Sequence, residues 1–149
     1  MSFPRILIVE DDTAIRTLLT AALRREPLEV HTAPDGLAGL ELVRANAYAV
    51  ILLDLMLPRV SGYEFLERFE ALLDGETPAP VVMVMTAFDA TAVKRLGSMR
   101  VQAILHKPFD IERLVEMTRD CAQLFQQQVD SLPGARKQPV SGDADTAAS

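Results

Sequence analysis

Two segments of the chain are continuous apolar runs without the alternation of a half-exposed strand. AVILL precedes Asp54, and VVMVM precedes Thr86. Strands that are buried on both faces of a parallel sheet have this composition. Three shorter runs rich in aliphatic and β-branched residues complete a set of five predicted strands, which are residues 5–9, 28–32, 48–53, 81–85 and 101–105.

Apolar residues recur at helical spacing between and after these strands. One predicted helical face carries Ile15, Leu18, Leu19 and Ala22. Two longer faces are formed by residues 65, 66, 69, 72 and 73 and by residues 111, 114, 115, 118, 121, 122 and 125. A weaker pattern near residues 90–96 predicts a fourth helix.

Helix start signals support this reading. Ser61 followed by Glu64 is the pattern of a capping box. Single aspartates precede the second, fourth and fifth predicted helices, and they are Asp35, Asp89 and Asp110. Asp74 and Gly75 are predicted to turn the chain after the third helix.

Strands that alternate with helices predict an α/β fold, a doubly wound parallel sheet of five strands with helices on both faces. Right-handed crossovers favour the flavodoxin-like strand order 2-1-3-4-5. In this order the carboxyl ends of strands 1 and 3 lie side by side at the topological switch point, where open α/β sheets bind their ligands. We therefore look for the functional site there.

Composition narrows the functional classes. An apolar share of 49 % and a charged share of 24 % are typical of a globular protein, and the net charge of -6 argues against general attraction to nucleic acid or anionic membranes. The single cysteine excludes an internal disulfide, and no apolar stretch approaches the roughly 20 residues that cross a bilayer. We expect a cytoplasmic protein with one domain at residues 1–130 and a disordered tail at residues 131–149.

Polar residues at the ends of the predicted strands form a candidate site. They are Glu10, Asp11, Asp54, Thr86 and Lys107. Three carboxylates about 5 Å apart would repel one another by roughly 3 kcal/mol per pair at an effective dielectric constant of 20, so they require a cation. Oxygen ligands with room for a phosphate favour Mg²⁺. Asp54 can then attack phosphorus while Mg²⁺, Lys107 and Thr86 stabilise the charge on the transferred oxygens.

The segments ILIVEDD, ILLDLMLPRVSG, VVMVMTA and HKPF resemble the receiver domain of bacterial two-component response regulators, over about residues 5–129. The resemblance implies that Asp54 is the phosphoacceptor and that Asp11 binds the metal directly, whereas Glu10 binds it through water. It also implies a backbone carbonyl ligand from Met56, a switch hydroxyl on Thr86, and a phosphoryl-binding Lys107 that precedes a cis Pro108.

By this resemblance the chain is expected to be a single-domain response regulator, similar to chemotaxis regulators. It would accept its phosphoryl group from a histidine kinase or a phosphotransfer protein and signal through protein–protein contacts, with a phosphorylation-dependent dimer left open. It would catalyse only its own phosphorylation and dephosphorylation. No helix-turn-helix pattern follows Val129, so we expect no direct DNA binding. The acidic net charge and the lack of a long apolar stretch lead us to expect no membrane partner. Ile104 departs from the family pattern, which often has an aromatic switch residue three positions before the lysine.

Three alternatives stay open. A Mg²⁺-dependent aspartyl phosphatase also uses an aspartate at a strand end, but that class needs a second acid at the position of Met56. A phosphate-independent scaffold would not need all five polar residues. A transcription-factor receiver would have lost its effector or rely on another chain. His31, His106 and Cys121 are predicted to be structural.

Overall fold

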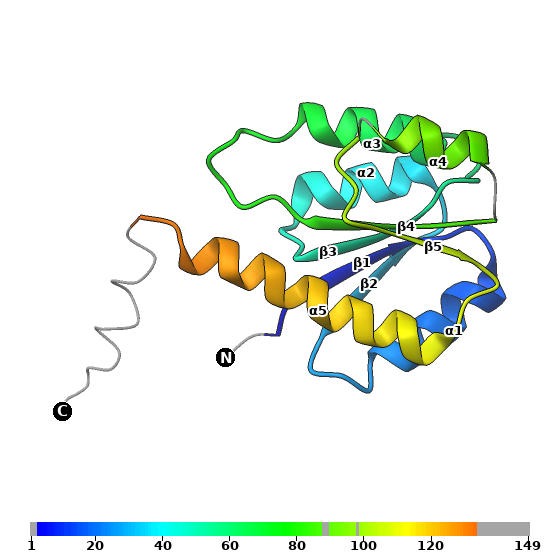
Figure 1. The fold of residues 1–149 in the computed structure, drawn as a ribbon, viewed down its shortest axis with the longest axis horizontal. Coiled ribbons are helices and arrows are strands. Elements are labelled where there is room, and N and C mark those ends of the chain that lie inside the picture. The colour runs from blue at the N-terminus through cyan, green and yellow to red at the C-terminus, as the bar shows by residue number, and fades with distance from the viewer. Residues whose placement is uncertain (1–2, 88–89, 98, 134–149) are drawn as a thin grey trace.

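A computed structural model of the chain describes residues 3–87, 90–97 and 99–133. Five parallel strands form one sheet in the order β2-β1-β3-β4-β5, which confirms the predicted topology (Figure 1). The strands are β1 (Arg5–Val9), β2 (Glu29–Ala33), β3 (Val50–Asp54), β4 (Val81–Ala87) and β5 (Ala103–Lys107).

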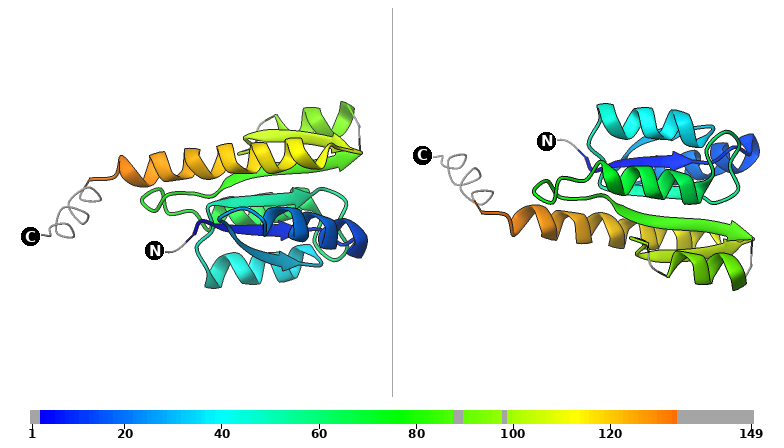
Figure 2. Two further views of the ribbon diagram at one scale, coloured as in Figure 1. Left: turned by 90° about the horizontal axis from the view of Figure 1, so that it is seen from below. Right: turned by 90° about the horizontal axis from the view of Figure 1, so that it is seen from above.

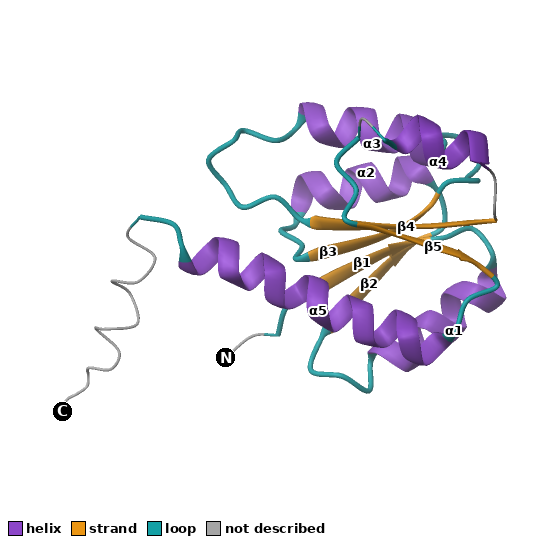
Figure 3. Ribbon diagram, in the orientation of Figure 1, coloured by secondary structure: helices purple, strands orange, loops and turns teal. Residues whose placement is uncertain are grey.

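Helices cover both faces of this sheet. They are α1 (Thr13–Leu23), α2 (Gly36–Ala45), α3 (Gly62–Ala71), α4 (Ala90–Leu96) and α5 (Ile111–Asp130). The helices α1 and α5 lie on one face, and α2, α3 and α4 lie on the other (Figures 1 and 3). The carboxyl-terminal part of α5 extends past the sheet, as the two turned views show (Figure 2). No helix in the described part of the chain is both long enough and apolar enough to span a bilayer.

Alternate residues of the central strands feed two separate cores. In β3, Val50 and Leu52 pack in the core beneath α1 and α5, whereas Ile51 and Leu53 pack in the core beneath α2 and α3. All five residues of β3 are buried. Burial on both faces therefore explains the continuous apolar run before Asp54.

The predicted helix starts are mostly confirmed. Asp35 and Asp110 cap α2 and α5, and Ser61 caps α3 by accepting a hydrogen bond from the Glu64 amide. Glu64 instead pairs with Arg68 at 2.6 Å, so the capping box is only half formed. Asp89 lies outside the described residues. At the other end of the chain, α5 ends at Asp130 and Ser131 is its C-cap. Most of the predicted tail, residues 134–149, lies outside the described residues.

Several predictions about local structure were wrong. Leu72 was expected on the apolar face of the third helix, but it follows α3 and is 44 % exposed, and β3 begins two residues later than predicted. Leu18 is 52 % exposed, because α1 buries an i, i+4 stripe of Ile15, Leu19 and Leu23, and Leu18 points about 100° away from the middle of that stripe. The fifth strand begins and ends two residues later than predicted. A hydrogen bond from the Val101 amide to the Met99 carbonyl holds this segment in a turn, so the ladder can begin only after it.

Candidate functional site

Three carboxylates meet where β1 and β3 end. Glu10 and Asp11 directly follow β1, and Asp54 is the last residue of β3. One oxygen from each carboxylate lies within 4.8 Å of the others. Glu10 and Asp54 are buried, with exposed fractions of 0 % and 3 %, whereas Asp11 faces solvent. The Glu10 and Asp54 carboxylates are thus shielded from water, whereas the Asp11 carboxylate lies beside them at the surface.

Lys107 supplies the positive charge in this cluster. It is the last residue of β5, and its Nζ lies 2.9 Å from Glu10 Oε1 and 3.1 Å from Asp54 Oδ2. The following peptide bond to Pro108 is cis, as the resemblance implied. Strands β3 and β5 flank β4 in the sheet, so the lysine reaches across one strand to Asp54 and across β4 and β3 to Glu10, which follows β1.

The electrostatics of the cluster are dominated by burial. Burial raises the pKa of Glu10, and the nearby Asp54 charge adds to this, although the hydrogen bonds from Lys107 and the Asp12 amide act in the opposite direction. Burial also disfavours the charged lysine, but its hydrogen bonds to Glu10 and Asp54 outweigh this and raise the pKa of Lys107. One ammonium group therefore serves two carboxylates and does not fully compensate Glu10.

This donor set fits a hard divalent cation. Oxygen atoms from Glu10, Asp11 and Asp54 converge, and a buried carboxylate with a raised pKa is stabilised when a cation is added. Met56 lies two residues after Asp54, and its amide donates to Asp54 Oδ1 at 3.0 Å. The expected metal ligand, the carbonyl of Met56, stays a prediction.

Thr86 lies near the end of β4 with an exposed fraction of 3 %. Its hydroxyl donates to the carbonyl of Ala87 at 2.8 Å and is therefore not directed at Asp54. A hydroxyl can turn about one bond to a new acceptor. Its predicted role as a switch thus requires the side chain to exchange this backbone acceptor for a phosphoryl oxygen.

Arg16 belongs to the surroundings of the site but was not predicted. Its Nη1 atom donates to the carbonyls of Glu10 and Asp11, at 2.7 and 3.4 Å. The sequence offered one indication of this role. Arg16 lies four residues after Asp12, the N-cap of α1, and is therefore close in the chain to the end of β1. Nothing in that spacing says that the side chain turns back toward the strand end.

Residues that were predicted to be structural lie away from the cluster. His31 bonds to the Tyr48 hydroxyl and to Glu29, at 2.8 and 2.9 Å, and Cys121 lies on the buried face of α5. His106 is exposed while its neighbour Lys107 turns to the acids, as alternation along a strand requires.

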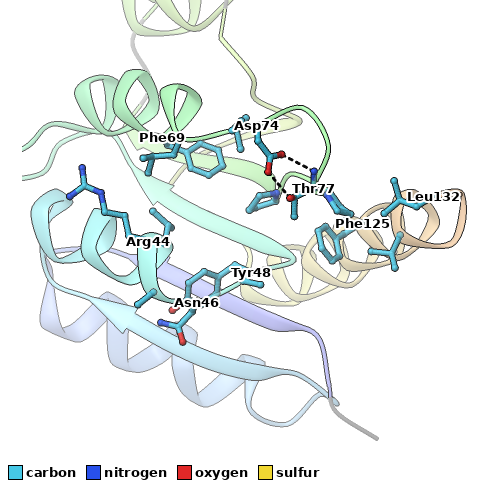
Figure 4. A pocket seen from close by; sticks show the side chains of 16 residues that line it. Arg44, Asn46, Tyr48, Phe69, Asp74, Thr77, Phe125 and Leu132 are labelled. Atoms are coloured by element: carbon cyan, nitrogen blue, oxygen red, sulfur yellow. Dashed lines mark hydrogen bonds between the residues drawn. The ribbon is translucent and has the colours of Figure 1, made fainter. Parts of the chain in front are cut away.

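A pocket of about 570 Å³ lies at the other end of the sheet (Figure 4). Tyr48 and Pro80, which precede β3 and β4, line it together with Phe69 and Phe125. The carboxylate cluster instead follows the carboxyl ends of β1 and β3. This pocket is therefore separate from the candidate site.

The chain is similar to known signalling proteins. A family model described as "Response regulator receiver domain" matches residues 6–119. The transcriptional regulatory protein CseB of Streptomyces avermitilis is 35 % identical over 120 residues, which cover 80 % of this chain and 49 % of that protein. The transcriptional activator protein PfeR of Pseudomonas aeruginosa is 37 % identical over 135 residues, covering 90 % and 42 %. The chain thus spans about half the length of the curated relatives it matches.

Solved structures agree with the sequence relatives. A CheY-like response regulator receiver domain protein from Methanospirillum hungatei superposes with a TM-score of 0.75 at 28 % identity, over 85 % of this chain and 99 % of that one. The family match includes Glu10, Asp54, Thr86 and Lys107. The chain belongs to the response regulator receiver domain family of two-component systems.

Proposed function

We propose that this receiver domain accepts a phosphoryl group on Asp54 in a Mg²⁺-dependent reaction. The observation that carries the proposal is the convergence of three carboxylates within 4.8 Å, with Lys107 3.1 Å from Asp54. Mg²⁺ and phosphorylation are typical of the family to which the chain belongs. Bound by Glu10, Asp11, Asp54 and the Met56 carbonyl, Mg²⁺ would neutralise charge on the phosphoryl oxygens.

The protein's own groups divide the remaining work. A carboxylate oxygen of Asp54 forms the new bond to phosphorus while the bond to the leaving group breaks. Lys107, already at hydrogen-bond distance from Asp54, donates to an equatorial phosphoryl oxygen. Thr86 rotates away from the Ala87 carbonyl and donates to a second oxygen. Both donors are held by strand ends, and of the two only the Thr86 hydroxyl has to change its hydrogen-bond partner.

The proposed phosphoryl donor is a histidine kinase or a phosphotransfer protein, and the proposed output is a contact with a protein partner. Two relatives are named as transcriptional regulators, but that output belongs to proteins about twice as long as this chain. Ile104, in place of the usual aromatic residue, packs against the core that contains Val84 and Leu96. Any signal from Thr86 to this face therefore travels without an aromatic rotamer change.

The phosphatase alternative has weaker support. Its second acid would stand at Met56, whose side chain is apolar and 74 % exposed. A phosphate-independent scaffold leaves the burial of Glu10 and Asp54 beside a single lysine unexplained, because burying two carboxylates with only one cation is costly. We therefore favour the phosphoacceptor function over both.

Treatment with acetyl phosphate and Mg²⁺, followed by intact mass measurement, tests the proposal. Wild type should gain one acid-stable, base-labile phosphoryl group, and Asp54→Ala should gain none. Asp74→Ala, which removes an acid at the other end of the sheet, is the matched control and should label like wild type. Undiminished labelling of Asp54→Ala would refute the assignment.

A further inference from the structure

The segment that joins β1 to α1 carries Glu10 and Asp11, two of the three clustered acids. Its backbone is hydrogen-bonded by Arg16. Arg16 is half-buried, and its Nη1 atom donates to the carbonyl oxygens of Glu10 and Asp11. No backbone amide of residues 3–87, 90–97 or 99–133 donates to either oxygen. Arg16 is therefore the group that satisfies both.

Other contacts fix the ends of this segment but not its middle. Asp12 caps α1 by accepting from the Ile15 amide, and its own amide donates to the Glu10 carboxylate, both at 3.0 Å. The Asp11 carboxylate faces solvent and makes no ion pair or hydrogen bond with the described residues. The direction in which Asp11 points thus depends on its backbone, and its backbone is held by Arg16.

We propose that Arg16 is a positioning residue for the metal site and holds Asp11 where it can bind Mg²⁺ directly. This inference rests on the proposed function. Mg²⁺ demands nearly ideal octahedral geometry, so a ligand on a loosened loop loses affinity. Groups that orient metal ligands typically contribute 10–100-fold to affinity. The two hydrogens of Arg16 Nη1 allow this one atom to donate to both neighbouring carbonyl oxygens.

The charge of Arg16 acts against this role, because a cation near the site repels Mg²⁺. Removing the side chain would therefore combine two opposite effects. Arg16→Lys separates them, because lysine keeps the charge but its shorter side chain does not place a nitrogen where Arg16 Nη1 donates to the two carbonyls. Arg16→Met removes both the charge and the donors. The difference between the two variants measures the electrostatic part.

The test is the dissociation constant for Mg²⁺, measured by calorimetric titration of the full chain. Arg16→Lys should raise it about tenfold. Arg25→Lys, a change at an exposed arginine just beyond the same helix, should leave it within twofold. If Arg16→Lys also stays within twofold, the inference is wrong. If wild type binds no Mg²⁺, the proposed function fails and the inference falls with it.

Two further readouts separate positioning from general damage. In metal-free protein, Arg16→Lys should shift the amide resonances of residues 10–13 and leave those of β4 and β5 in place. At saturating Mg²⁺, its phosphorylation rate with acetyl phosphate should return to that of wild type. A rate that stays low at saturating Mg²⁺ would assign Arg16 to the transfer step and overturn the inference.

Discussion

The two ends of the sheet share the same backbone ladders but differ in what their side chains do. At the carboxyl end, buried Glu10 and Asp54 share Lys107. At the amino end, aromatic side chains such as Tyr48 and Phe69 line an apolar pocket, beside the turn that contains Asp74 (Figure 4). Both ends thus place carboxylates near strand termini, but only one end gathers several of them.

The two settings move carboxyl pKa values in opposite directions. Asp74 accepts from the Glu76 and Thr77 amides and from the Thr77 hydroxyl, and these bonds lower its pKa to about 2. Burial raises the pKa of Glu10. Asp74 is thus satisfied by its own turn, whereas the carboxyl end of the sheet needs a further cation. This difference predicts which variants respond to Mg²⁺.

Lys107→Met should give the largest change in stability. It leaves two buried carboxylates without their shared cation, and breaking such a pair costs about 3–5 kcal/mol when it is fully buried. Because the Lys107 side chain is 22 % exposed, we expect about 2–3 kcal/mol in EDTA and less at saturating Mg²⁺. Urea unfolding with and without Mg²⁺ measures this. Lys94→Met, on exposed α4, should change little, and an equal loss in both variants would contradict the comparison.

Met56→Asn should shorten the life of the phosphorylated state. The Met56 side chain is 74 % exposed beside Asp54, and it cannot orient a water molecule for attack on phosphorus. Asparagine can, so we expect hydrolysis about tenfold faster. Adding Phe88→Glu should increase the rate further, although Phe88 lies outside the described residues. Met56→Leu is the matched control, and a time course in which all variants match wild type would reject the idea.

Asp74→Asn should have a smaller effect that depends on pH and not on Mg²⁺. The folded pKa of Asp74 lies below its ordinary value of 3.8, so the charged form stabilises the fold above that pH and this contribution disappears as the pH falls to about 2. The melting temperature at neutral pH should fall by about 1–2 °C, since the group is exposed. The difference from wild type should shrink on acidification, and one that grew would reverse the assigned sign. Asp120→Asn, an exposed acid on α5, is the control.

Deletion of residues 134–149 should have the smallest effect. This segment has too few apolar residues to bury the surface that would be needed to order it. The deletion begins at residue 134 because Ser131 caps α5 and Leu132 lines the pocket. Truncation after Pro133 should leave the melting temperature and the phosphorylation rate unchanged. Truncation after Asp130, which removes both contacts, should lower the melting temperature.

The comparison also explains what could be predicted from the sequence. Strands β3 and β4 are buried on both faces, and their continuous apolar runs show this in the sequence. The sheet order, and with it the position of the acids at the strand ends, could therefore be predicted from local pattern and topology. Leu18 was wrongly placed in the core because the spacing of apolar residues in a helix does not show how much of the helix surface its neighbours cover. The start of β5 depended on a turn over residues 99–101, which contain neither glycine nor proline and lie two residues after Gly97.

Side-chain direction was the least predictable property of the site. Lys107 was expected to meet Asp54, and it does, but its equal contact with Glu10 depends on the exact stagger of three strands. Thr86 lies where expected, yet its hydroxyl is bound to the Ala87 carbonyl. Arg16 was missed because its partners are backbone carbonyls, which every residue has and no sequence motif marks.

A crystal structure of the chain with Mg²⁺ and beryllofluoride tests the central claim most directly. Beryllofluoride is a phosphoryl mimic that binds carboxylates. The account predicts it on Asp54, with Mg²⁺ bound to Asp11, Asp54 and the Met56 carbonyl, and with Lys107 and the Thr86 hydroxyl on its fluorine atoms. Beryllofluoride on another residue, or a Thr86 hydroxyl still bound to the Ala87 carbonyl beside an occupied Asp54, would contradict it.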